Sequence, residues 1–566
     1  MLKRRIPFGI ENYREMIEHN YYYVDKTLLI KEILDCRSKV FLMTRPRRFG
    51  KTLGLSMIQT FFEDERDEHG AKIENLSWFK EKKIMDAGEF YTSQAGIYPI
   101  IKLSLKSAKQ LDFDTAYHCL IREIAGEFHR HKYLLESDVI NEAEAEEYSA
   151  LMNLKADYKQ YVTSLFILSK YLKRFHGRSA IILIDEYDVP LENAWMQGFY
   201  ETMINFIRSL FESALKTNDH LAFAVITGCL RISKESIFTG LNNLQTVSIL
   251  DKQFGEYFGF TPVEVEEMLE FYEIGEHKEA AKRWYDGYLF GNKEVYNPWS
   301  VINYVHDTVN GTITFPKPYW SNTSSNSIVK ELIERADSQV RKDIEHLIDG
   351  GVIEKPIHED ITYDSVYDSQ DNLWNFLFFT GYLKKESERQ EGDLQYLTMS
   401  IPNAEISYIY KNMILAWFDK KIRKMDMTPL IRAFEDGDCE NAEKFLSAQL
   451  MDTISFYDYQ ESYYHGFLVG ILKCSNAYIV LSNRETGTGR SDIILQETVF
   501  GGRGMILELK VAKKIKDMDR LCNEALAQIE DRQYEETLRE DGYREILKYG
   551  ICFFKKGCRI KRLTNQ

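Results

Sequence analysis

The sequence lacks the cysteine arrangements that hold structural metals. Its 566 residues include eight cysteines, but none forms a C-x-x-C pair or matches the Cys/His spacing of a zinc site. Structural zinc needs such closely spaced ligands, so we expect no zinc site. Scattered cysteines are typical of reduced thiols, and we therefore expect a cytoplasmic protein.

Long apolar runs are also missing. No run approaches the roughly 20 residues that a membrane-spanning helix needs. The N-terminal segment MLKRRIPFGIENY is charged, and it is not followed by the apolar stretch of a secretory signal. These absences predict a soluble, unexported protein with no membrane partner.

The sequence contains fewer basic than acidic residues. It has 72 Lys and Arg residues and 87 Asp and Glu residues, which gives a formal net charge of −15. This balance argues against a protein that coats nucleic acid non-specifically, so any such contact must come from local basic patches. A hydrophobic content of 44% and an aromatic content of 13% indicate a folded chain. Its length suggests about three domains.

The segment KVFLMTRPRRFGKT, residues 39–52, predicts a strand, a loop and the start of a helix. Gly50, Lys51 and Thr52 match the second half of a phosphate-binding loop, in which backbone N–H groups and a helix N-terminus surround phosphate oxygens. We expect Lys51 to be an exposed loop lysine that reaches the β- and γ-phosphates, and Thr52 to ligate Mg²⁺. Arg45 stands where the usual G-x-x-x-x-G-K-[ST] pattern has its first glycine.

A second apolar run, residues 180–184, ends at Asp185 and Glu186. Such a run is typical of a strand buried on both faces of a parallel sheet. In a P-loop ATPase the Asp at this place holds Mg²⁺ through water and the next Glu polarises the attacking water, roles that we assign to Asp185 and Glu186. Taken alone, the segment also fits a buried strand that ends in solvated acids.

The runs RPRRFGKT and LIDEYDVPL, with the upstream YVDKT at residues 23–27, resemble the bacterial and archaeal AAA-ATPase-like family that often carries a C-terminal PD-(D/E)xK nuclease domain. In that family RPRRFGK is the usual form of the loop, so an arginine at position 45 is expected. The resemblance covers nearly the whole chain and implies ATP and Mg²⁺ as cofactors. The expected nucleotide contacts are Arg45, Pro46, Arg47, Arg48, Phe49, Gly50, Lys51, Thr52 and Asp185.

Strand-like and helical patterns alternate along the first half of the chain. Strands are predicted at residues 40–43, 98–105, 180–184 and 221–227. Helices are predicted after the loop, at 112–174 as one long segment, and at 195–217. This order predicts an α/β fold with a parallel sheet that binds ligands at the carboxyl ends of its strands.

Arg231 follows the fourth predicted strand, which ends at Thr227. P-loop ATPases place polar sensors of the γ-phosphate at this point, so Arg231 is a sensor candidate. An ordinary surface charge is the alternative.

The domain prediction has three parts: an ATPase-like domain at 1–256, a helical lid with a helical or winged module at 257–427, and a nuclease-like α/β domain at 428–566. Thr261, Pro262 and Glu264 mark a helix start near the first boundary. The aromatic run FLFFTGYL at 376–383 is expected in the core rather than in a ligand pocket.

The last predicted domain reads as a helix at 461–473, strands at 477–485, 489–495 and 505–511, and a helix at 517–532. Asp492 and Glu508-Leu509-Lys510 supply a D…E-x-K pattern on neighbouring strands. Because strand side chains alternate, Glu508 and Lys510 face the same side. Charged residues on a half-exposed hairpin produce this pattern by chance, so the frame of helices and strands carries the prediction.

The five residues Glu461, Asp492, Glu508, Lys510 and Gln528 match the PD-(D/E)xK pattern one by one. Phosphodiester cleavage needs a metal that binds the phosphate and lowers the pKa of its water, and carboxylates suit Mg²⁺. The resemblance implies Asp492 and Glu508 as metal ligands and Glu461 as a further ligand. It implies Lys510 as the residue that orients the water or stabilises charge, and Gln528 as a water or phosphate contact.

Basic residues in this domain either contact phosphates or form a solvated face. They are Lys513, Lys514, Lys516, Lys555, Lys556, Arg559, Lys561 and Arg562. His465, on the Glu461 face of its helix, is expected to make a packing hydrogen bond rather than bind metal.

Together these patterns predict a P-loop ATPase whose nucleotide state controls a Mg²⁺-dependent nuclease acting on nucleic acid, with DNA favoured over RNA. The alternative is a non-catalytic regulator that binds nucleotide as a switch and nucleic acid or protein through an inert nuclease-like fold. The sequence leaves a homo-oligomer open.

Overall fold

The computed structural model describes most of the chain and divides it into two compact units. The described residues are 4–67, 69–231, 237–238, 243–322, 329, 331, 338–359, 366, 369–422, 426–451, 461–473, 477–486, 489–499 and 502–563. The first unit comprises Met1–Val329 and Val352–Tyr408, and the second comprises Lys330–Gly351 and Ile409–Gln566. Within the described ranges no helix is both long and apolar enough to cross a membrane.

The first unit is built on a five-stranded parallel sheet with the order β2-β3-β4-β1-β5. Its strands are β1 (Val40–Thr44), β2 (Ile100–Ser104), β3 (Ala180–Asp185), β4 (Leu221–Gly228) and β5 (Leu244–Val247). Every residue of β1 and β3 is buried, as expected of strands covered on both faces. The predicted α/β fold is confirmed, and the short polar strand β5 was not predicted.

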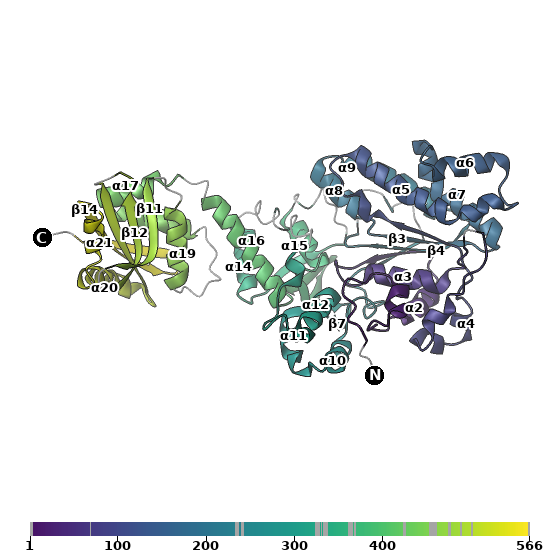
Figure 1. The fold of residues 1–566 in the computed structure, drawn as a ribbon, viewed down its shortest axis with the longest axis horizontal. Coiled ribbons are helices and arrows are strands. Elements are labelled where there is room, and N and C mark those ends of the chain that lie inside the picture. The colour runs from purple at the N-terminus through teal and green to yellow at the C-terminus, as the bar shows by residue number, and fades with distance from the viewer. Residues whose placement is uncertain are drawn as a thin grey trace. The chain divides into compact units, whose positions relative to one another are not determined.

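Helices cover both faces of this sheet (Figure 1). One side carries α2 (Leu28–Cys36), α3 (Lys51–Phe62) and α4 (Glu89–Thr92). The other side carries α5 (Phe113–Arg130), α6 (Glu142–Met152), α7 (Tyr158–His176), α8 (Val189–Gln197) and α9 (Tyr200–Leu215). Helix α1 (Tyr13–Glu18) packs against α3, where the Tyr13 N–H donates to Ser56 Oγ at 3.0 Å.

The single long helix expected at 112–174 is wrong, because the chain forms three helices there. Asn141 and Glu144 make a capping box at the start of α6, and Asp157 and Gln160 make one at the start of α7. Each box satisfies N–H groups that a helix start leaves without a partner, so it restarts the helix. Both motifs are visible in the sequence.

A helical segment follows the sheet within the first unit. It contains α10 (Pro262–Phe271), α11 (Lys278–Tyr285), the hairpin β6 (Tyr288–Phe290) and β7 (Lys293–Val295), and α12 (Pro298–Val309). Thr261 and Glu264 form the predicted helix start as a capping box. A small apolar core that includes Met268, Tyr285 and Tyr304 holds these elements together.

The rest of the middle region contains a small antiparallel sheet of order β8-β10-β9. In the first unit its elements are β8 (Ile353–Ile357), α15 (Gln370–Phe379), β9 (Lys384–Glu391) and β10 (Leu394–Ser400). The helix α14 (Ser338–Ile348) belongs to the second unit, and α16 (Ala404–Ile422) begins in the first unit and continues into the second. Phe376, Phe378 and Leu383 are buried, as expected for the aromatic run.

The second unit ends in a five-stranded sheet with the order β11-β12-β13-β14-β15. Its strands are β11 (Tyr478–Thr486), β12 (Gly489–Glu497), β13 (Arg503–Val511), β14 (Glu545–Phe554) and β15 (Gly557–Arg562). Its helices are α17 (Thr428–Asp436), α18 (Cys439–Met451), α19 (Glu461–Leu472), α20 (Met518–Asp531) and α21 (Glu535–Glu540). The strands β14 and β15 and the helix α21 were not predicted.

The second sheet has apolar cores on both of its faces. Leu507 and Leu509 belong to one core with α17, α18 and α19. Ile494 and Ile506 belong to the other, with α20 and α21. Because strand side chains alternate between these two covered faces, every second residue of a strand points toward α20.

Candidate nucleotide and nuclease sites

The loop between β1 and α3 contains two residues in the left-handed backbone region. Gly50, the N-cap of α3, has φ +83°, and Arg48 has φ +72°. Glycine adopts such angles without a Cβ penalty, which explains its presence at the last turn before the helix. The loop thus brings the N-terminus of α3 to the carboxyl end of the sheet.

Lys51 is buried, with 7% of its surface exposed, so the expectation of an exposed loop lysine is wrong. Its Nζ donates to the carbonyl oxygens of Arg45 at 2.8 Å and Pro46 at 2.9 Å. An ammonium has three donors and must find acceptors when it is taken from water, and the loop backbone supplies them. Lys51 also lines a cavity in the first unit.

The two expected Mg²⁺ ligands of the nucleotide site lie in direct contact. Thr52 Oγ1 donates to Asp185 Oδ2 at 2.7 Å, and Thr227 Oγ1 donates to Asp185 Oδ1. The register explains this meeting, because β4 pairs with both β1 and β3 and the three strands end side by side. The side chains expected at the carboxyl ends of these strands therefore lie together and are joined by hydrogen bonds.

Glu186 has a strained backbone, with φ +52°, and lines the same cavity. Such an angle is uncommon outside glycine and tends to occur at functional positions. Burial raises the pKa of its carboxyl above the usual value, and the negative charge of Asp185 adds to the shift. Lys51 and Lys106, which line the same cavity, oppose that shift.

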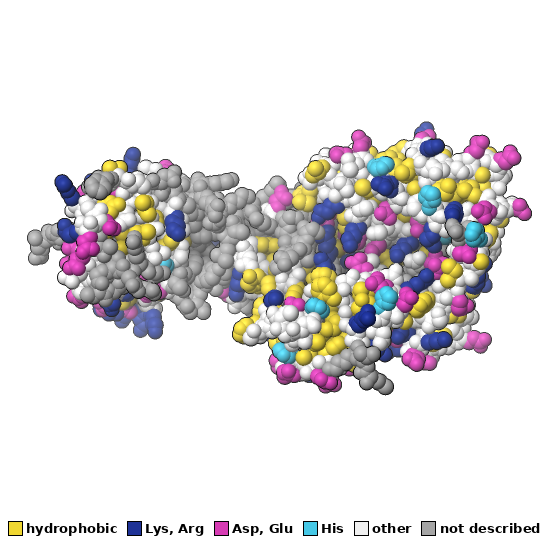
Figure 2. All heavy atoms as spheres, in the orientation of Figure 1, with side chains coloured by type: hydrophobic (Ala, Val, Ile, Leu, Met, Phe, Trp, Pro, Cys, Tyr) yellow, Lys and Arg dark blue, Asp and Glu magenta, His cyan; other side chains and the backbone are white. Residues whose placement is uncertain are grey.

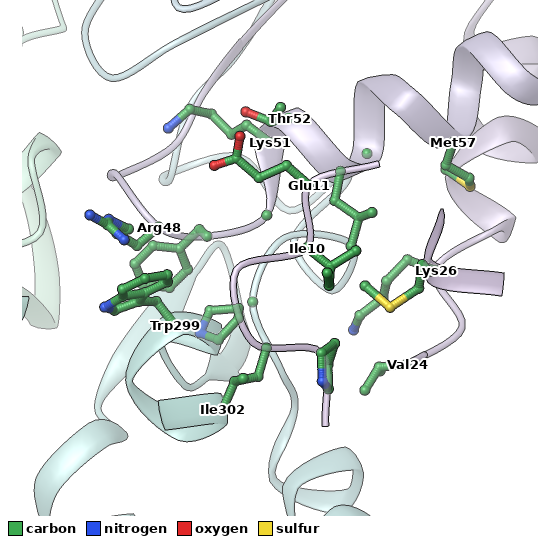
Figure 3. A pocket seen from close by; sticks show the side chains of 18 of the residues that line it. Ile10, Glu11, Val24, Lys26, Arg48, Lys51, Thr52, Met57, Trp299 and Ile302 are labelled. Atoms are coloured by element: carbon green, nitrogen blue, oxygen red, sulfur yellow. The ribbon is translucent and has the colours of Figure 1, made fainter. Parts of the chain in front are cut away.

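The cavity has a volume of about 390 Å³, within the range of small-ligand pockets. Gly50, Lys51 and Thr52 line one end of it. Figure 3 shows the apolar side chains that line it elsewhere, which include Ile10, Val24, Met57, Trp299 and Ile302. A polar end at the helix N-terminus and a more apolar remainder suit a ligand that has both a charged and an apolar part.

Arg47 and Arg48 also line this cavity. Arg48 places its guanidinium 3.9 Å from the centre of the Trp299 ring, a cation–π contact between the loop and α12. Arg47 is paired with Glu192 of α8. Phe49 also lines the cavity, and its ring is buried against Tyr288 and Phe290.

The YVDKT segment joins the N-terminal part of the chain to α10. Lys26 Nζ donates to the Glu264 carboxylate at 2.6 Å and to the Glu256 carbonyl oxygen at 2.6 Å. Asp25 accepts from the Thr27 N–H at 2.9 Å. Val24 and Lys26 line the cavity, so this segment both holds the helical part in place and forms a wall.

Arg45 was expected among the nucleotide contacts, but its side chain is fully buried and points into the protein. Its Nη1 donates to the carbonyl oxygens of Thr44 at 2.9 Å and Val247 at 3.0 Å. The guanidinium lies between the rings of Phe258, at 5.4 Å, and Phe290, at 5.2 Å. Desolvation lowers its pKa to about 10, so it stays charged at neutral pH.

We predict that Arg45→Gly destabilises the protein although it restores the usual loop pattern. Removing this side chain leaves a cavity between β5 and two aromatic rings, at a cost of about 3 kcal/mol. The midpoint of thermal unfolding should fall by several degrees, and ATP affinity should fall with it. Arg45→Met, which keeps most of the volume, is the matched control and should lose less. A glycine variant as stable as the parent chain would show that Arg45 does not hold the loop.

Arg231 lies apart from the cavity-lining residues and forms an ion pair with Glu359 at 3.6 Å. Glu359 also accepts from Ser248 Oγ at 2.7 Å. This placement favours the surface-charge alternative over a γ-phosphate sensor. Pro46 lies outside the cavity lining as well, and it contributes its carbonyl oxygen to Lys51.

In the second unit, Asp492 and Glu508 lie opposite each other where β12 pairs with β13, one step beyond the Ile493–Leu507 pair. The Leu509 N–H donates to Asp492 Oδ2 at 2.8 Å, and the Asp492 N–H lies 3.4 Å from Glu508 Oε2. Alternation along the strands places Asp492, Glu508 and Lys510 on the α20 face. The predicted convergence of the D…E-x-K residues is present.

Glu508 is 1% exposed, and two of the other predicted residues, Gln528 and Lys510, lie close to its carboxylate. Gln528 Nε2 of α20 donates to Glu508 Oε1, and Lys510 Nζ lies 3.6 Å from the same oxygen. Burial and the Asp492 charge raise the pKa of Glu508 to about 7, while Lys510 opposes the shift. Two carboxylates held this close form a site that a cation would stabilise.

Glu461 does not join this group. It is an exposed residue in the first turn of α19, a helix that packs on the opposite face of the sheet. Across the described part of the chain, no three His, Cys, Asp or Glu side chains come close enough to hold a metal ion together. His465 Nε2 lies 2.9 Å from the Asp492 carbonyl oxygen, in line with the expected packing hydrogen bond.

Five of the eight basic residues named for this domain fall into two groups. Arg559 pairs with Glu443 at 3.1 Å and Lys561 with Asp519 at 3.4 Å, which is typical of a solvated face. Lys513, Lys514 and Lys516 follow β13 directly, are exposed, and have no ion-pair partner among the described residues. This second group remains available for phosphate contacts.

Sequence reasoning missed most of the residues that line this cavity, among them Glu11, Lys106 and Trp299. Lys106 comes directly after a predicted strand, at the end where ligands bind, so its position was a usable signal. Glu11 and Trp299 reach the cavity only through tertiary packing, for which the sequence offers no pattern.

Comparisons with known proteins match two segments of the chain to families. Residues 7–238 match the family described as "Predicted AAA-ATPase", and residues 459–563 match the "PD-(D/E)XK nuclease superfamily". A protein of Azotobacter chroococcum mcd 1, described as an uncharacterized protein in the vnfD 5' region, is 22% identical over 565 residues, which covers 96% of this chain and 95% of that protein. The chain therefore joins an AAA-ATPase-like domain to a C-terminal domain of the PD-(D/E)XK nuclease superfamily.

Proposed function

We propose that this protein binds and hydrolyses ATP in its first unit, and cleaves DNA with Mg²⁺ in its second. The observation that carries the nuclease half is the group formed by Asp492, Glu508, Lys510 and Gln528 on one face of the sheet. The contact between Thr52 and Asp185 beside the loop lysine supports the ATPase half.

At the nucleotide site, Lys51 and the N-terminus of α3 bind the phosphates, while Thr52 and Asp185 hold Mg²⁺. The base and ribose occupy the apolar part of the cavity, where Trp299 and Ile302 provide contact surface. Glu186 accepts a proton from the attacking water, and its raised pKa suits an acceptor in a largely desolvated place.

At the nuclease site, Asp492 and Glu508 are the residues that would hold the metal. The metal supplies a Lewis acid and a more acidic bound water. Lys510 stabilises the negative charge that develops on the phosphate, and Gln528 keeps the Glu508 carboxylate in place. Lys513, Lys514 and Lys516 contact DNA phosphates near the point of cleavage. ATP turnover regulates this cleavage.

Glu186→Gln tests the ATPase half. The amide keeps the size of the side chain but cannot accept the proton of the attacking water, so the rate of phosphate release should fall by about 100-fold or more. The Kd for ATP should stay within about threefold of the value for the parent chain, because the phosphate contacts remain. Phosphate release and an ATP titration on the same preparation measure both quantities. Equal turnover by variant and parent would remove Glu186 from the reaction.

One observation favours the alternative of a non-catalytic regulator. Among the described residues, Asp492 and Glu508 have no third metal-binding side chain beside them. A regulator would bind DNA and leave it intact with Mg²⁺ or Mn²⁺, whereas the nuclease would cut. DNA binding in EDTA, followed by addition of each metal, separates the two functions.

A further inference from the structure

A lysine beyond the P-loop lies at the phosphate end of the nucleotide cavity. The 3₁₀ turn η3 (Leu105–Ala108) follows β2 directly and carries Lys106. Ser104, the last residue of β2, pairs with Asp185 at the end of β3. Lys106 therefore emerges at the same edge of the sheet as Glu186, and both residues line the cavity with Lys51.

The ion pair between the Lys106 ammonium and Glu11 is weak. Its Nζ lies 3.8 Å from Glu11 Oε2, and the two side chains are 63% and 64% exposed. Exposed pairs at such distances contribute little free energy, so the ammonium is readily transferred to a stronger anion. A triphosphate in the cavity is such an anion.

Glu11 belongs to the N-terminal segment and lines the same cavity. Figure 3 shows its side chain reaching toward the end of the cavity that holds Lys51 and Thr52. A carboxylate in this place repels phosphate oxygens when they bind beside Lys51. The Glu11–Lys106 pair is therefore expected to open as the nucleotide enters.

The strand register also indicates which phosphate Lys106 faces. Lys106 comes two residues after Ser104, which pairs with Asp185, the neighbour of Glu186, and Glu186 is the residue proposed to contact the attacking water. Lys109 also lines the cavity, but it lies three residues further along the chain from this edge of the sheet. We therefore place Lys106, rather than Lys109, at the reacting end of the nucleotide. Dark blue Lys and Arg side chains are visible around the hollow in this unit (Figure 2).

We propose that Lys106 leaves Glu11 and binds the γ-phosphate of ATP, so that the chain supplies its own transition-state cation. This inference rests on the proposed ATPase function. In the reaction, water attacks the γ-phosphorus, the bond to the β,γ-bridging oxygen breaks, and that oxygen leaves on ADP with the electron pair. Glu186 takes the proton, and Lys106 stabilises charge on the γ-phosphoryl oxygens, the role that an arginine finger has in other P-loop enzymes.

A comparison of two nucleotides tests this role without relying on turnover. Full-length protein is titrated with Mg²⁺ and either ADP or the β,γ-imido analogue of ATP, and the experiment is repeated with Lys106→Ala. The variant should bind the analogue at least about tenfold more weakly and bind ADP unchanged, because only the analogue carries the γ-phosphate. Lys106→Arg should recover most of the loss, and Glu11→Gln should tighten binding of the analogue.

Lys216→Ala, at an exposed lysine outside the cavity, is the control and should match the parent chain. An equal loss for ADP and the analogue, or no loss for either, would overturn the role of Lys106 while leaving the nucleotide site in place. A parent chain that binds neither nucleotide would remove the nucleotide site and the role of Lys106 together.

Discussion

Lys51→Ala is expected to weaken ATP binding by at least about 100-fold, or roughly 2.7 kcal/mol. The Lys51 ammonium lies at the phosphate end of the cavity and is held there by the carbonyl oxygens of Arg45 and Pro46. A bound triphosphate would replace weak neutral acceptors with charged oxygens, and such hydrogen bonds are about twice as strong. Calorimetric titration with ATP and Mg²⁺ measures the loss.

The buried position of Lys51 requires a folding control. Its removal leaves two carbonyl oxygens without a donor, which costs about 1–3 kcal/mol if water does not replace it. The thermal unfolding midpoint of the variant should therefore be recorded beside the titration. A variant that stays folded and binds ATP with the affinity of the parent chain would show that this loop does not hold the phosphates.

Asp492→Asn and Glu508→Gln should each reduce the rate of DNA cleavage by at least about 1,000-fold, and the double variant should be little worse than either one. The two carboxylates are neighbours and would share one metal, so loss of either disables the same site. Both changes remove a negative charge from a close pair of carboxylates, of which Glu508 is buried, so neither should unfold the domain. Nicking of circular DNA in Mg²⁺ measures the rates.

Lys510→Ala serves as the companion variant for this pair. An ammonium is not a metal ligand, so this variant should retain metal binding and still cut slowly. Mn²⁺ should replace Mg²⁺, whereas Ca²⁺ should not, because Ca²⁺ prefers looser oxygen shells of higher coordination number. Additive losses in the double variant, or cleavage without any metal, would contradict a shared metal site.

The sequence-based prediction was most accurate where a buried strand leads directly into a polar motif. The apolar runs before Arg45 and Asp185 each specify a covered parallel strand, and the motifs follow at the carboxyl ends. The meeting of Asp492 with Glu508 follows from strand alternation in the same way. In these cases the local pattern that predicts the strand also determines where its motif lies in the folded domain.

The sequence predicted least where burial depends on distant segments. Nothing local shows that Arg45 points inward between Phe258 and Phe290, because both rings come from a part of the chain about 200 residues away. Strand β5 has a polar sequence and joins the sheet through its pairing with β1. The PD-(D/E)xK pattern placed Glu461 in the metal group, but α19 packs its apolar residues on the other face of the sheet.

The most direct test is cleavage of supercoiled DNA by the full chain beside its Asp492→Asn variant. Both proteins are incubated in Mg²⁺ with and without ATP, and linear DNA and RNA are included as further substrates. Nicking of DNA by the parent chain that depends on the metal, changes with ATP and disappears in the variant is the predicted result. Intact DNA under every condition despite measurable DNA binding, or equal nicking by both proteins, would contradict it.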